Sequence, residues 1–369
     1  MNLKVAGAGI AGLSAAITAT RLADVKVQVR DTANSIEKKI SRGINALRNY
    51  DSKSDIIEEY QRLGFNFTGF HPIYKQIFLL NPDRFFEIES EEKPIFYTTE
   101  RGTNSSIDNI LLQQALSLNV EVEWNSSFNR PDILATGSKY NHCIGYGEHF
   151  VDVEDTSTII ILQNSKYCPF GYACILPYGK NEATVILGSF NPIQSSSVKR
   201  NYYRLIAEIP QFKEYIDDAS VMHQLRGVGN FGLPDSAVNG SMMIVGERAG
   251  FLEAFRGFGI HNAIISGYSA GLACANGTNY DDLWKEKLSK SLMRGILRRI
   301  AENEQKLGSE QILTKLLEKI DKQVSLDKFR YELKKLEKSM LNNLDLPMLF
   351  KYLVEWNQKY PFSNVASNE

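Results

Sequence analysis

The feature that most constrains this chain is a glycine turn near its N-terminus, which reads Gly7-Ala8-Gly9-Ile10-Ala11-Gly12. The short apolar run before it, residues 3–6, predicts a strand, and residues 13–22 carry Ala and Leu at the spacing of a helix. In residues 25–31, valines alternate with other residues up to an aspartate, which predicts a second strand. These pieces form a βαβ unit of roughly 30 residues. We therefore expect the chain to open with a parallel sheet.

A turn of this composition suits a dinucleotide phosphate site. Backbone N–H groups and the positive end of a helix can close on a pyrophosphate only where side chains leave room. Gly7, Gly9 and Gly12 have the spacing of the dinucleotide fingerprint. Asp31 follows at the predicted end of the second strand, where a carboxylate accepts hydrogen bonds from ribose hydroxyl groups. A plain strand-to-helix turn and a solvated loop acid are the alternatives.

The remaining sequence divides between this first sheet and a second one. Residues 107–137 predict a helix and two strands that return to the first sheet, which a strand at 242–245 and a helix at 259–274 complete late. From about residue 150 to 238, aromatic and β-branched runs broken by Gly, Pro and Asn predict an antiparallel sheet. Beyond about residue 281, Leu-rich charged segments predict helices.

Two further segments resemble motifs of flavoproteins. Residues 131–137, Pro-Asp-Ile-Leu-Ala-Thr-Gly, resemble the Asp-x-x-x-Ala-Thr-Gly motif. Residues 245–250, Val-Gly-Glu-Arg-Ala-Gly, resemble Gly-Asp-Ala-Ala-Gly, with Glu247 in the place of Asp. Together with the first turn, these segments are similar to the p-hydroxybenzoate hydroxylase superfamily, in which FAD lies extended across a Rossmann-type domain.

Within that superfamily, three stretches resemble the geranylgeranyl reductase-like flavoprotein dehydrogenases. Residues 169–177 are similar to the Tyr-x-Trp-x-Phe-Pro motif at the substrate pocket, with Cys174 and Leu176 in place of Trp and Phe. Residues 250–260 are similar to the loop and helix start that face the flavin, and residues 101–108 resemble the segment that enters the middle helix. This likeness implies an FAD-dependent enzyme.

The sequence pattern and the resemblance together imply a domain division. We expect an α/β protein in which a Rossmann-type FAD-binding domain is combined with an antiparallel β-sheet substrate domain and a helical C-terminal region. The segments expected for these three parts are, in turn, 1–70, 101–149 and 241–280; 71–100 and 150–240; and 281–369.

FAD is the cofactor that the resemblance implies, and its expected contacts come from several parts of the chain. They are Gly7, Ala8, Gly9, Ile10, Ala11, Gly12, Asp31, Arg42, Thr136, Gly137, Gly246, Glu247, Gly257, Gly259 and Ile260. Arg42, in the loop after the second strand, would pair with the pyrophosphate in a forked geometry; a surface arginine is the alternative. Gly257 and Gly259 would let N–H groups and the helix dipole face the reduced flavin, unless they mark a plain helix start.

The pocket for an apolar substrate is expected on the strand after residue 171. Its expected lining residues are Tyr172, Cys174, Leu176 and Pro177. Side chains in a strand alternate between its two faces, so Tyr172, Cys174 and Leu176 share one face. Ala173 and Ile175 would be buried against the neighbouring layer. One face is thus available to a ligand.

His261, directly after the predicted helix start, is the one candidate for a general acid, because histidine titrates near neutrality. A partly buried histidine with satisfied hydrogen bonds is the commoner role at such a position. The five histidines are scattered along the chain and predict no metal site.

Charge and composition narrow the surroundings in which the chain is expected to act. Its 42 basic residues balance 43 acidic ones, so no overall field attracts nucleic acid. The four cysteines form no CxxC pair, and the N-terminus has no signal-peptide pattern, which favours the reducing cytoplasm. The sequence has no apolar run of about 18 residues, so it predicts no spanning helix. Peripheral contact with a membrane stays open.

These expectations converge on an FAD-dependent oxidoreductase that moves a hydride between flavin and a hydrophobic substrate. The resemblance implies reduction of double bonds in prenyl chains of a lipid. Since the sequence has one nucleotide fingerprint, electrons are expected from transiently bound NAD(P)H or from a ferredoxin-like protein. A flavin monooxygenase of the same fold and a non-catalytic flavin- or lipid-binding protein are the alternatives.

Overall fold

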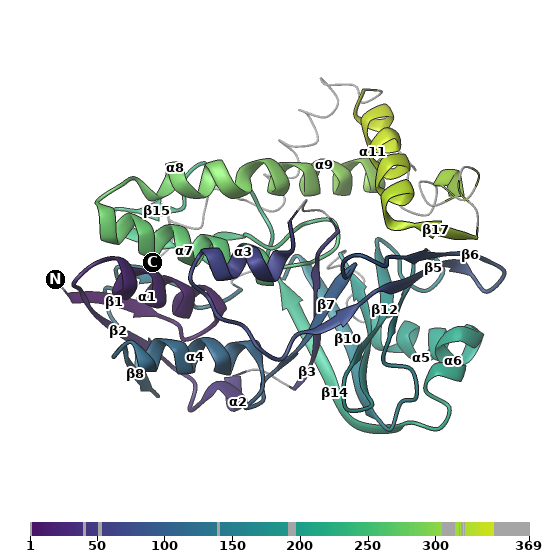
Figure 1. The fold of residues 1–369 in the computed structure, drawn as a ribbon, viewed down its shortest axis with the longest axis horizontal. Coiled ribbons are helices and arrows are strands. Elements are labelled where there is room, and N and C mark those ends of the chain that lie inside the picture. The colour runs from purple at the N-terminus through teal and green to yellow at the C-terminus, as the bar shows by residue number, and fades with distance from the viewer. Residues whose placement is uncertain are drawn as a thin grey trace.

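The computed structural model describes residues 2–39, 42–50, 54–138, 141–190, 197–304, 314–316, 318, 320 and 322–342. Its strands form three sheets (Figure 1). At one end of the molecule lies a six-stranded sheet with its helices, and at the other end an eight-stranded sheet flanked by α5 (Val198–Glu208) and α6 (Pro210–Tyr215). Helix α9 (Lys290–Glu304) runs from the first end towards the second.

The six-stranded sheet is the predicted Rossmann-type sheet. Its order is β15 (Val238–Asn239), β16 (Met242–Ile244), β9 (Ile133–Leu134), β1 (Asn2–Ala6), β2 (Lys26–Asp31) and β8 (Glu121–Trp124). All neighbours pair in parallel except β15 and β16. The late return of the chain at residues 242–244, next to β9, confirms the predicted completion of the sheet.

Three longer helices cover this sheet. They are α1 (Ile10–Leu22), α4 (Ile107–Ser117) and α7 (Ile260–Asn276). The shorter helices α2 (Ile36–Lys39) and α3 (Ile56–Arg62) follow β2 in the sequence. Their apolar faces and the strands form one buried cluster that extends to Trp284 in α8 (Tyr280–Trp284).

Helices α1 and α7 touch through small residues. A Cβ atom built on Gly267 would lie 2.2 Å from the carbonyl oxygen of Ala11, and one on Gly271 would lie 2.5 Å from that of Ala15. Both distances are too short for real atoms, so only glycine allows the two backbones to approach this closely. The helix that follows the glycine turn is thus fixed directly to the helix near residue 260.

The eight-stranded sheet is mainly antiparallel, as predicted. Its order is β14 (Ser220–Gly229), β10 (Cys143–Val151), β13 (Glu182–Ser189), β12 (Gly171–Tyr178), β11 (Thr158–Leu162), β5 (Lys75–Asn81), β6 (Arg84–Glu89) and β17 (Gln323–Ser325). The pairs β11–β5 and β17–β6 are parallel. The chain returns to this sheet at Cys143, earlier than the expected residue 150, because β10 pairs with β14 from Cys143 and with β13 from Ile144.

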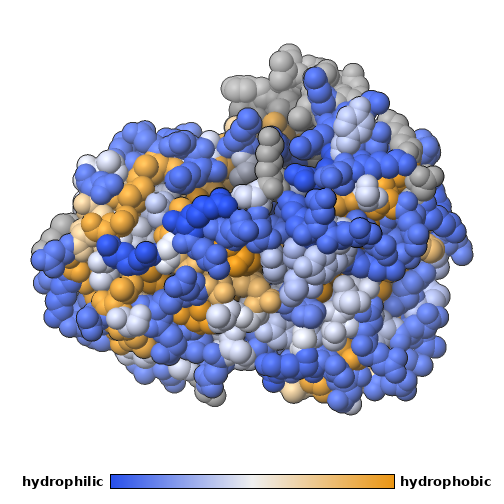
Figure 2. All heavy atoms as spheres, in the orientation of Figure 1, coloured by the Kyte–Doolittle hydropathy of each residue, from blue (hydrophilic) through white to orange (hydrophobic). Residues whose placement is uncertain are grey.

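The strands of a third, smaller sheet lie, along the chain, between strands of the two larger sheets. It consists of β3 (Gly43–Arg48), β7 (Phe96–Arg101) and β4 (His71–Ile73), all antiparallel. Figure 2 shows that, on the face drawn, apolar side chains gather over the half built on the six-stranded sheet, whereas the other half is mostly hydrophilic.

The C-terminal region is helical, as expected, but it also contributes a strand. Helix α11 (Leu326–Asn342) follows β17 directly, and Phe329 packs against Phe78 and Phe86 of the eight-stranded sheet. In the part of the chain that the structure describes, no helix is both long enough and apolar enough to cross a membrane.

Candidate functional site

The glycine turn is built by backbone atoms that leave no space for side chains. Gly7 has φ +108°, and a Cβ atom there would lie 2.3 Å from the carbonyl oxygen of Ala135. A Cβ on Gly12 would lie 1.9 Å from the carbonyl oxygen of Gly7. Gly9 is the N-cap of α1, and no side chain caps that helix. The N-terminal end of α1 is therefore shaped by glycine, as a phosphate site requires.

Asp31 lies against this turn. Its side chain is buried, with Oδ2 accepting the Ala8 N–H at 2.7 Å and Oδ1 accepting the Ala33 N–H at 2.9 Å. The carboxylate thus links the end of β2 to the turn. This is the place that the sequence predicts for a group that contacts ribose.

The segment around Thr136 and Gly137 lies on the other side of the turn. The Ala135 N–H donates to the carbonyl of Ala6 at 2.7 Å, which continues the pairing of β9 with β1. Thr136 is exposed, and Gly137 has φ +81° with no heavy atom within 4 Å of a built Cβ. The chain leaves the sheet here in a conformation that favours glycine.

Residues 246–249 form a 3-10 turn that packs onto the start of α1. Gly246 has φ +61°, its N–H donates to Oγ of Ser266 at 3.0 Å, and a Cβ there would lie 2.9 Å from that of Ala11. Gly259 is the N-cap of α7, which begins at Ile260, and a Cβ on Gly259 would lie 3.5 Å from Oε1 of Glu247. The structure thus brings the first glycine turn, Glu247 and the α7 N-terminus together.

Glu247 is a partly buried carboxyl group with an unusual titration. Burial raises its pKa to about 7, and the nearby Arg101 guanidinium offsets part of that rise. A carboxyl group in this state holds its proton up to near-neutral pH. Below neutral pH, the predicted cofactor site therefore contains a carboxyl group that is mostly uncharged.

Arg101, near Glu247, forms an ion pair with Asp108 that the sequence does not predict. Nε and Nη2 of Arg101, at the end of β7, donate to the two oxygens of Asp108, in the first turn of α4, at 2.5 and 3.0 Å. Asp108 is fully buried. Both residues lie in the segment 101–108 that carries part of the resemblance, but the spacing of residues in that segment does not tell which side chains meet.

Arg42 contacts two carboxylates in the structure. Its Nη2 is 2.6 Å from Oε1 of Glu182 and 3.7 Å from Oε1 of Glu100, and its carbonyl oxygen is in hydrogen-bond distance of the His223 ring. The guanidinium is therefore engaged by carboxylates of β13 and β7. Its role towards a pyrophosphate stays a prediction.

His261, in the first turn of α7, contacts helix α3. Its Nδ1 is 3.1 Å from the hydroxyl oxygen of Tyr60, a fully buried residue of α3. The histidine is partly buried, and it does not line the pocket described next. Its role as a general acid stays a prediction.

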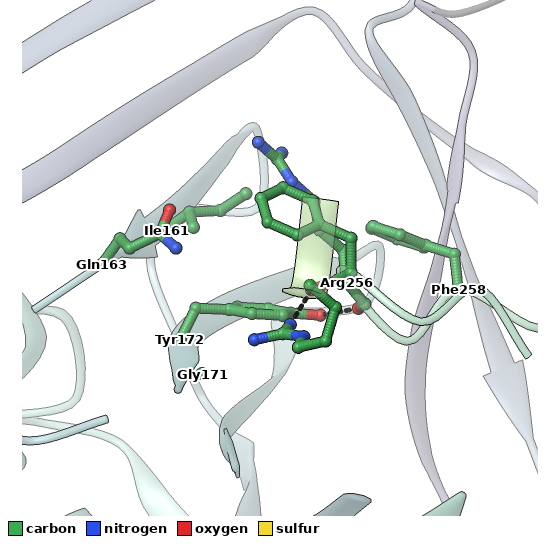
Figure 3. Close-up of a pocket in the computed structure, with 8 residues that line it drawn as sticks. Ile161, Gln163, Gly171, Tyr172, Arg256 and Phe258 are labelled. Carbon is green, nitrogen blue, oxygen red and sulfur yellow. Dashed lines mark hydrogen bonds between the residues drawn. The ribbon is translucent and has the colours of Figure 1, made fainter. Parts of the chain in front are cut away.

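A narrow pocket lies between the eight-stranded sheet and the loop before α7 (Figure 3). It is lined by Ile161, Gln163, Gly171, Tyr172, Phe255, Arg256, Phe258 and Arg299. The Tyr172 hydroxyl donates to the carbonyl of Arg256 at 2.5 Å, which fixes the loop against β12. Gly257, with φ +71°, provides the turn in this loop.

Of the four residues expected at the pocket, the structure places Tyr172 in its wall. Cys174 and Leu176 share the face of Tyr172, as the alternation predicts, but they pack into an apolar cluster with Phe329 and other C-terminal residues. Pro177 is buried, and its carbonyl accepts from the Thr98 hydroxyl at 2.7 Å. The C-terminal region covers Cys174 and Leu176, whereas Pro177 lies on the opposite face of β12, and none of the three is among the residues that line this pocket.

Within the described ranges, no cluster of three or more His, Cys, Asp or Glu residues has the arrangement of a metal site. The positive ends of α1 and α7 and the glycine turns instead suit a phosphate-containing organic cofactor.

Comparisons with curated proteins point to one kind of relative, although no family model matches the sequence. The digeranylgeranylglycerophospholipid reductase 2 of Methanosphaera stadtmanae is 28% identical over 148 residues, which cover 40% of this chain and 37% of that protein. The digeranylgeranylglycerophospholipid reductase of Methanosphaerula palustris is 31% identical over 129 residues, 34% of this chain and 30% of that protein. The chain thus spans about a third of the length of the curated relatives it matches.

Solved structures extend the comparison to the whole chain. A geranylgeranyl bacteriochlorophyll reductase-like protein of Thermoplasma acidophilum matches with a TM-score of 0.67 and 18% identity, covering 99% of this chain and 97% of that one. A flavin-dependent brominase matches with a TM-score of 0.64 and 14% identity over 97% of this chain and 100% of that one. The predicted resemblance and fold class are confirmed: this chain has the fold of flavin-dependent reductases and halogenases, and part of its sequence is similar to digeranylgeranylglycerophospholipid reductases.

Proposed function

We propose that this protein is an FAD-dependent oxidoreductase that reduces double bonds of a hydrophobic isoprenoid lipid. The observation that carries the proposal is that one loop lines the pocket and also leads into the predicted flavin site. Phe255, Arg256 and Phe258 line the pocket, and the same loop enters α7 at Gly259, beside the Glu247 carboxyl group. A substrate in this pocket would therefore lie next to a flavin at the α7 N-terminus, as hydride transfer requires.

The residues at the predicted cofactor site fit FAD. The positions of Gly7 and Gly12 are ones that a Cβ would fill, and they leave the N-terminal end of α1 to an anion such as the pyrophosphate. Asp31 stands beside the turn for the ribose. Gly246 and Glu247 would lie along the ribityl part, and Gly259 and Ile260 at the ring.

When bound, FAD supplies the hydride chemistry. The chain's own residues would position the lipid and exclude water, with Tyr172, Phe255 and Phe258 as the apolar wall. The positive end of the α7 dipole would stabilise negative charge on the ring. The Tyr172 hydroxyl is held by the Arg256 carbonyl, which keeps the wall in place for the substrate.

The partners follow from the same proposal. The names of the curated relatives support a lipid with isoprenoid chains as the substrate. NAD(P)H or a ferredoxin-like protein would supply the electrons, and peripheral contact with a membrane would give access to a lipid that resides there.

An absorption spectrum of the purified protein, before and after dithionite, tests the cofactor. We expect a flavin spectrum that bleaches on reduction. Incubation of the reduced protein with an unsaturated isoprenoid glycerophospholipid under anaerobic conditions tests the reaction, and mass spectrometry should find two added hydrogens per reduced double bond. A protein without flavin would contradict the proposal.

The oxygen requirement separates this function from a monooxygenase of the same fold. Product that forms only with oxygen uptake and contains an added oxygen atom would replace the reductase by the monooxygenase. A flavin-loaded protein that binds the lipid and leaves it unchanged would instead indicate a binding protein.

A further inference from the structure

The eight-stranded sheet ends at a long strand that has a neighbour on one side only. This edge strand is β14 (Figure 1), which at ten residues is the longest strand that the structure describes. The opposite edge of the same sheet is β17, with three residues. The edges of the six-stranded sheet are β15, with two residues, and β8, which contains Glu121 and Glu123. Short or charged edges resist pairing with other chains, so β14 differs from these three strands.

The composition of β14 does not protect its edge. The strand contains no Pro or Lys, and Arg226 is its one permanently charged residue. Val221, Met222 and Val228 are 52%, 46% and 50% exposed. Within the described part of the chain, β10 is the only strand that pairs with β14. The edge thus presents apolar side chains together with unpaired backbone groups.

The outward backbone groups of β14 belong to alternate residues. The Gly229 carbonyl accepts the His142 N–H at 2.9 Å, at the end of the pairing with β10, so it points towards β10. The N–H and C=O groups of successive strand residues point to opposite sides. Gln224, Arg226 and Val228 therefore direct their backbone groups away from β10, where an added antiparallel strand could bind them.

A bulge determines which side chains of β14 share a face. The register between β14 and β10 shifts before Val221, which leaves Met222 as an extra residue. Val221 pairs with Phe150 and Val228 pairs with Ile144. Both of these β10 side chains pack in the apolar cluster that includes residues of α5. Val221 and Val228 therefore both point to the face of the sheet that α5 covers.

We propose that this edge binds a second copy of the protein, with the two β14 strands antiparallel about a twofold axis at Leu225. Twofold pairing of one surface with itself is the commonest way in which proteins form dimers. Leu225 then lies opposite its own copy, and Gln224 lies opposite Arg226. Because Gln224 and Arg226 direct their backbone groups outward, each can exchange two hydrogen bonds with the other strand. Arg226 faces an uncharged amide and not a second arginine.

The same register also matches the apolar side chains. The two residues at the bulge, Met222 and His223, lie opposite Gly227 of the second copy, where a Cβ atom would have no neighbour within 4 Å in one subunit. Beyond the bulge, Val221 lies opposite Val228. These two half-exposed side chains point to the same face of the sheet, so they bury each other. This self-complementarity favours a second copy over a different protein as the partner.

Association of the full chain at several concentrations tests the pairing. We expect sedimentation equilibrium to show a monomer–dimer equilibrium over roughly 1–100 μM. V228K places an ammonium group against Val221 and should weaken dimerisation roughly 10-fold or more, and V221E should do so with a carboxylate. L116K, at a position 43% exposed in α4, is the control and should associate like the parent. A parent that stays monomeric, or V228K that associates like L116K, would overturn the proposal.

A mixture of the two variants tests the register. In a heterodimer of V221E and V228K, the introduced carboxylate faces the introduced ammonium group at one end, and Val228 faces Val221 at the other. The mixture should regain association close to that of the parent, because opposite charges across two strands attract. A mixture that associates no better than either variant alone would overturn this register.

A cross-link at Leu225 tests the position of the axis. Opposite residues that exchange no hydrogen bonds have Cα atoms about 4.5 Å apart, a distance that a disulfide spans. L225C should therefore form a disulfide-linked dimer on mild oxidation. In R226C the two Cα atoms would be about 7–8 Å apart, so cross-linking should be much slower. The parent controls for the native cysteines. Equal cross-linking of L225C and R226C, or none in L225C, would overturn the axis at Leu225.

Discussion

At the residue scale, the predicted cofactor site depends on glycines, which have no Cβ atom. Gly7 and Gly12 stand where any Cβ would meet a backbone carbonyl within 2.3 Å, whereas Gly227 in β14 has open space around it. Only the first kind of glycine is required by its surroundings.

Replacing Gly12 by Ala should therefore abolish flavin binding. The new Cβ would lie 1.9 Å from the Gly7 carbonyl oxygen, so the turn must open, and we expect a loss of about 1–3 kcal/mol in stability. Flavin absorbance per protein and urea unfolding are the measurements. Gly227→Ala is the control and should keep its flavin; parent-like flavin content in Gly12→Ala would remove the turn from the site.

Glu247 gives a pH dependence to the flavin-free protein. Its pKa is about 7 in the folded state, against an ordinary value of 4.5, so the folded chain holds a proton that the unfolded chain releases. The stabilisation is complete below about pH 4.5 and is lost as the pH rises through about 7, by roughly 3 kcal/mol in total.

Glu247→Gln removes this titration. Relative to the parent, the variant should gain roughly 3 kcal/mol of unfolding free energy between pH 4.5 and pH 8, as measured by urea unfolding at several pH values. Glu121→Gln, at an exposed position of β8, should leave the profile unchanged. Parallel profiles for parent and Glu247→Gln would show that the carboxyl group is not desolvated.

At the element scale, the contact between α1 and α7 makes two distant segments into one unit. Gly271 faces the α1 backbone, and a Cβ there would lie 2.5 Å from the Ala15 carbonyl oxygen and 2.6 Å from Cβ of Thr18. The contact holds the glycine turn at the start of α1 in register with the loop at the start of α7.

Gly271→Ala should push the two helices apart. We expect a loss of about 1–3 kcal/mol of stability and weaker flavin binding, because both halves of the cofactor site move. Gly277→Ala is the matched control: it lies at the C-terminal end of the same helix, with φ +65° and no atom near its Cβ, and should cost about 1–2 kcal/mol without affecting flavin affinity. Equal flavin affinity in both variants would contradict this coupling.

The elements show what the sequence could predict. Residues 3–6, 13–22 and 25–31 correspond to β1, α1 and β2 within a few residues, because hydrophobic period and glycine spacing are local signals. The strand at 242–244 was predictable because a flavoprotein motif follows it. By contrast, β17 has three residues and gains its stability from pairing with β6, which no local pattern reveals.

The candidate site was predictable to a similar extent. Turns that depend on glycine are visible in the sequence, but side-chain partners are not. The pairing of Arg42 with Glu182 joins residues 140 positions apart, and the pair Arg101–Asp108 depends on how β7 meets α4. Cys174 has the predicted orientation, but the C-terminal region that covers it comes from about 150 residues later in the chain.

At the scale of the whole molecule, the C-terminal region closes the apolar face beside the pocket. Phe329 is 1% exposed, stacks on Phe78 at a ring distance of 6.0 Å and meets Tyr50 edge to face at 6.3 Å. Tyr50 is also the partner of Arg256 in the pocket. The C-terminal region thus packs against Tyr50, which in turn holds the Arg256 side chain at the pocket.

Phe329→Ala should weaken the packing of the C-terminal region against the eight-stranded sheet. The loss of a buried phenyl ring costs about 3–5 kcal/mol, which would weaken the docking of β17 and α11 while leaving the six-stranded sheet intact. Hydrogen exchange should become faster in β6 and β17, with unchanged flavin content. Tyr331→Ala, at a position 64% exposed on the same helix, is the control; unchanged exchange in Phe329→Ala would show that other contacts hold the region.

The separation of α1 from α7 along the chain has a consequence for synthesis. About 240 residues lie between the end of α1 and the start of α7, which a ribosome adds in roughly 12–50 s. During that time β9 has no β16 beside it, and the small-residue face of α1 has no partner. We therefore expect the nascent chain to remain sensitive to protease in its first 30 or so residues until α7 has emerged, and the cofactor to be captured only afterwards.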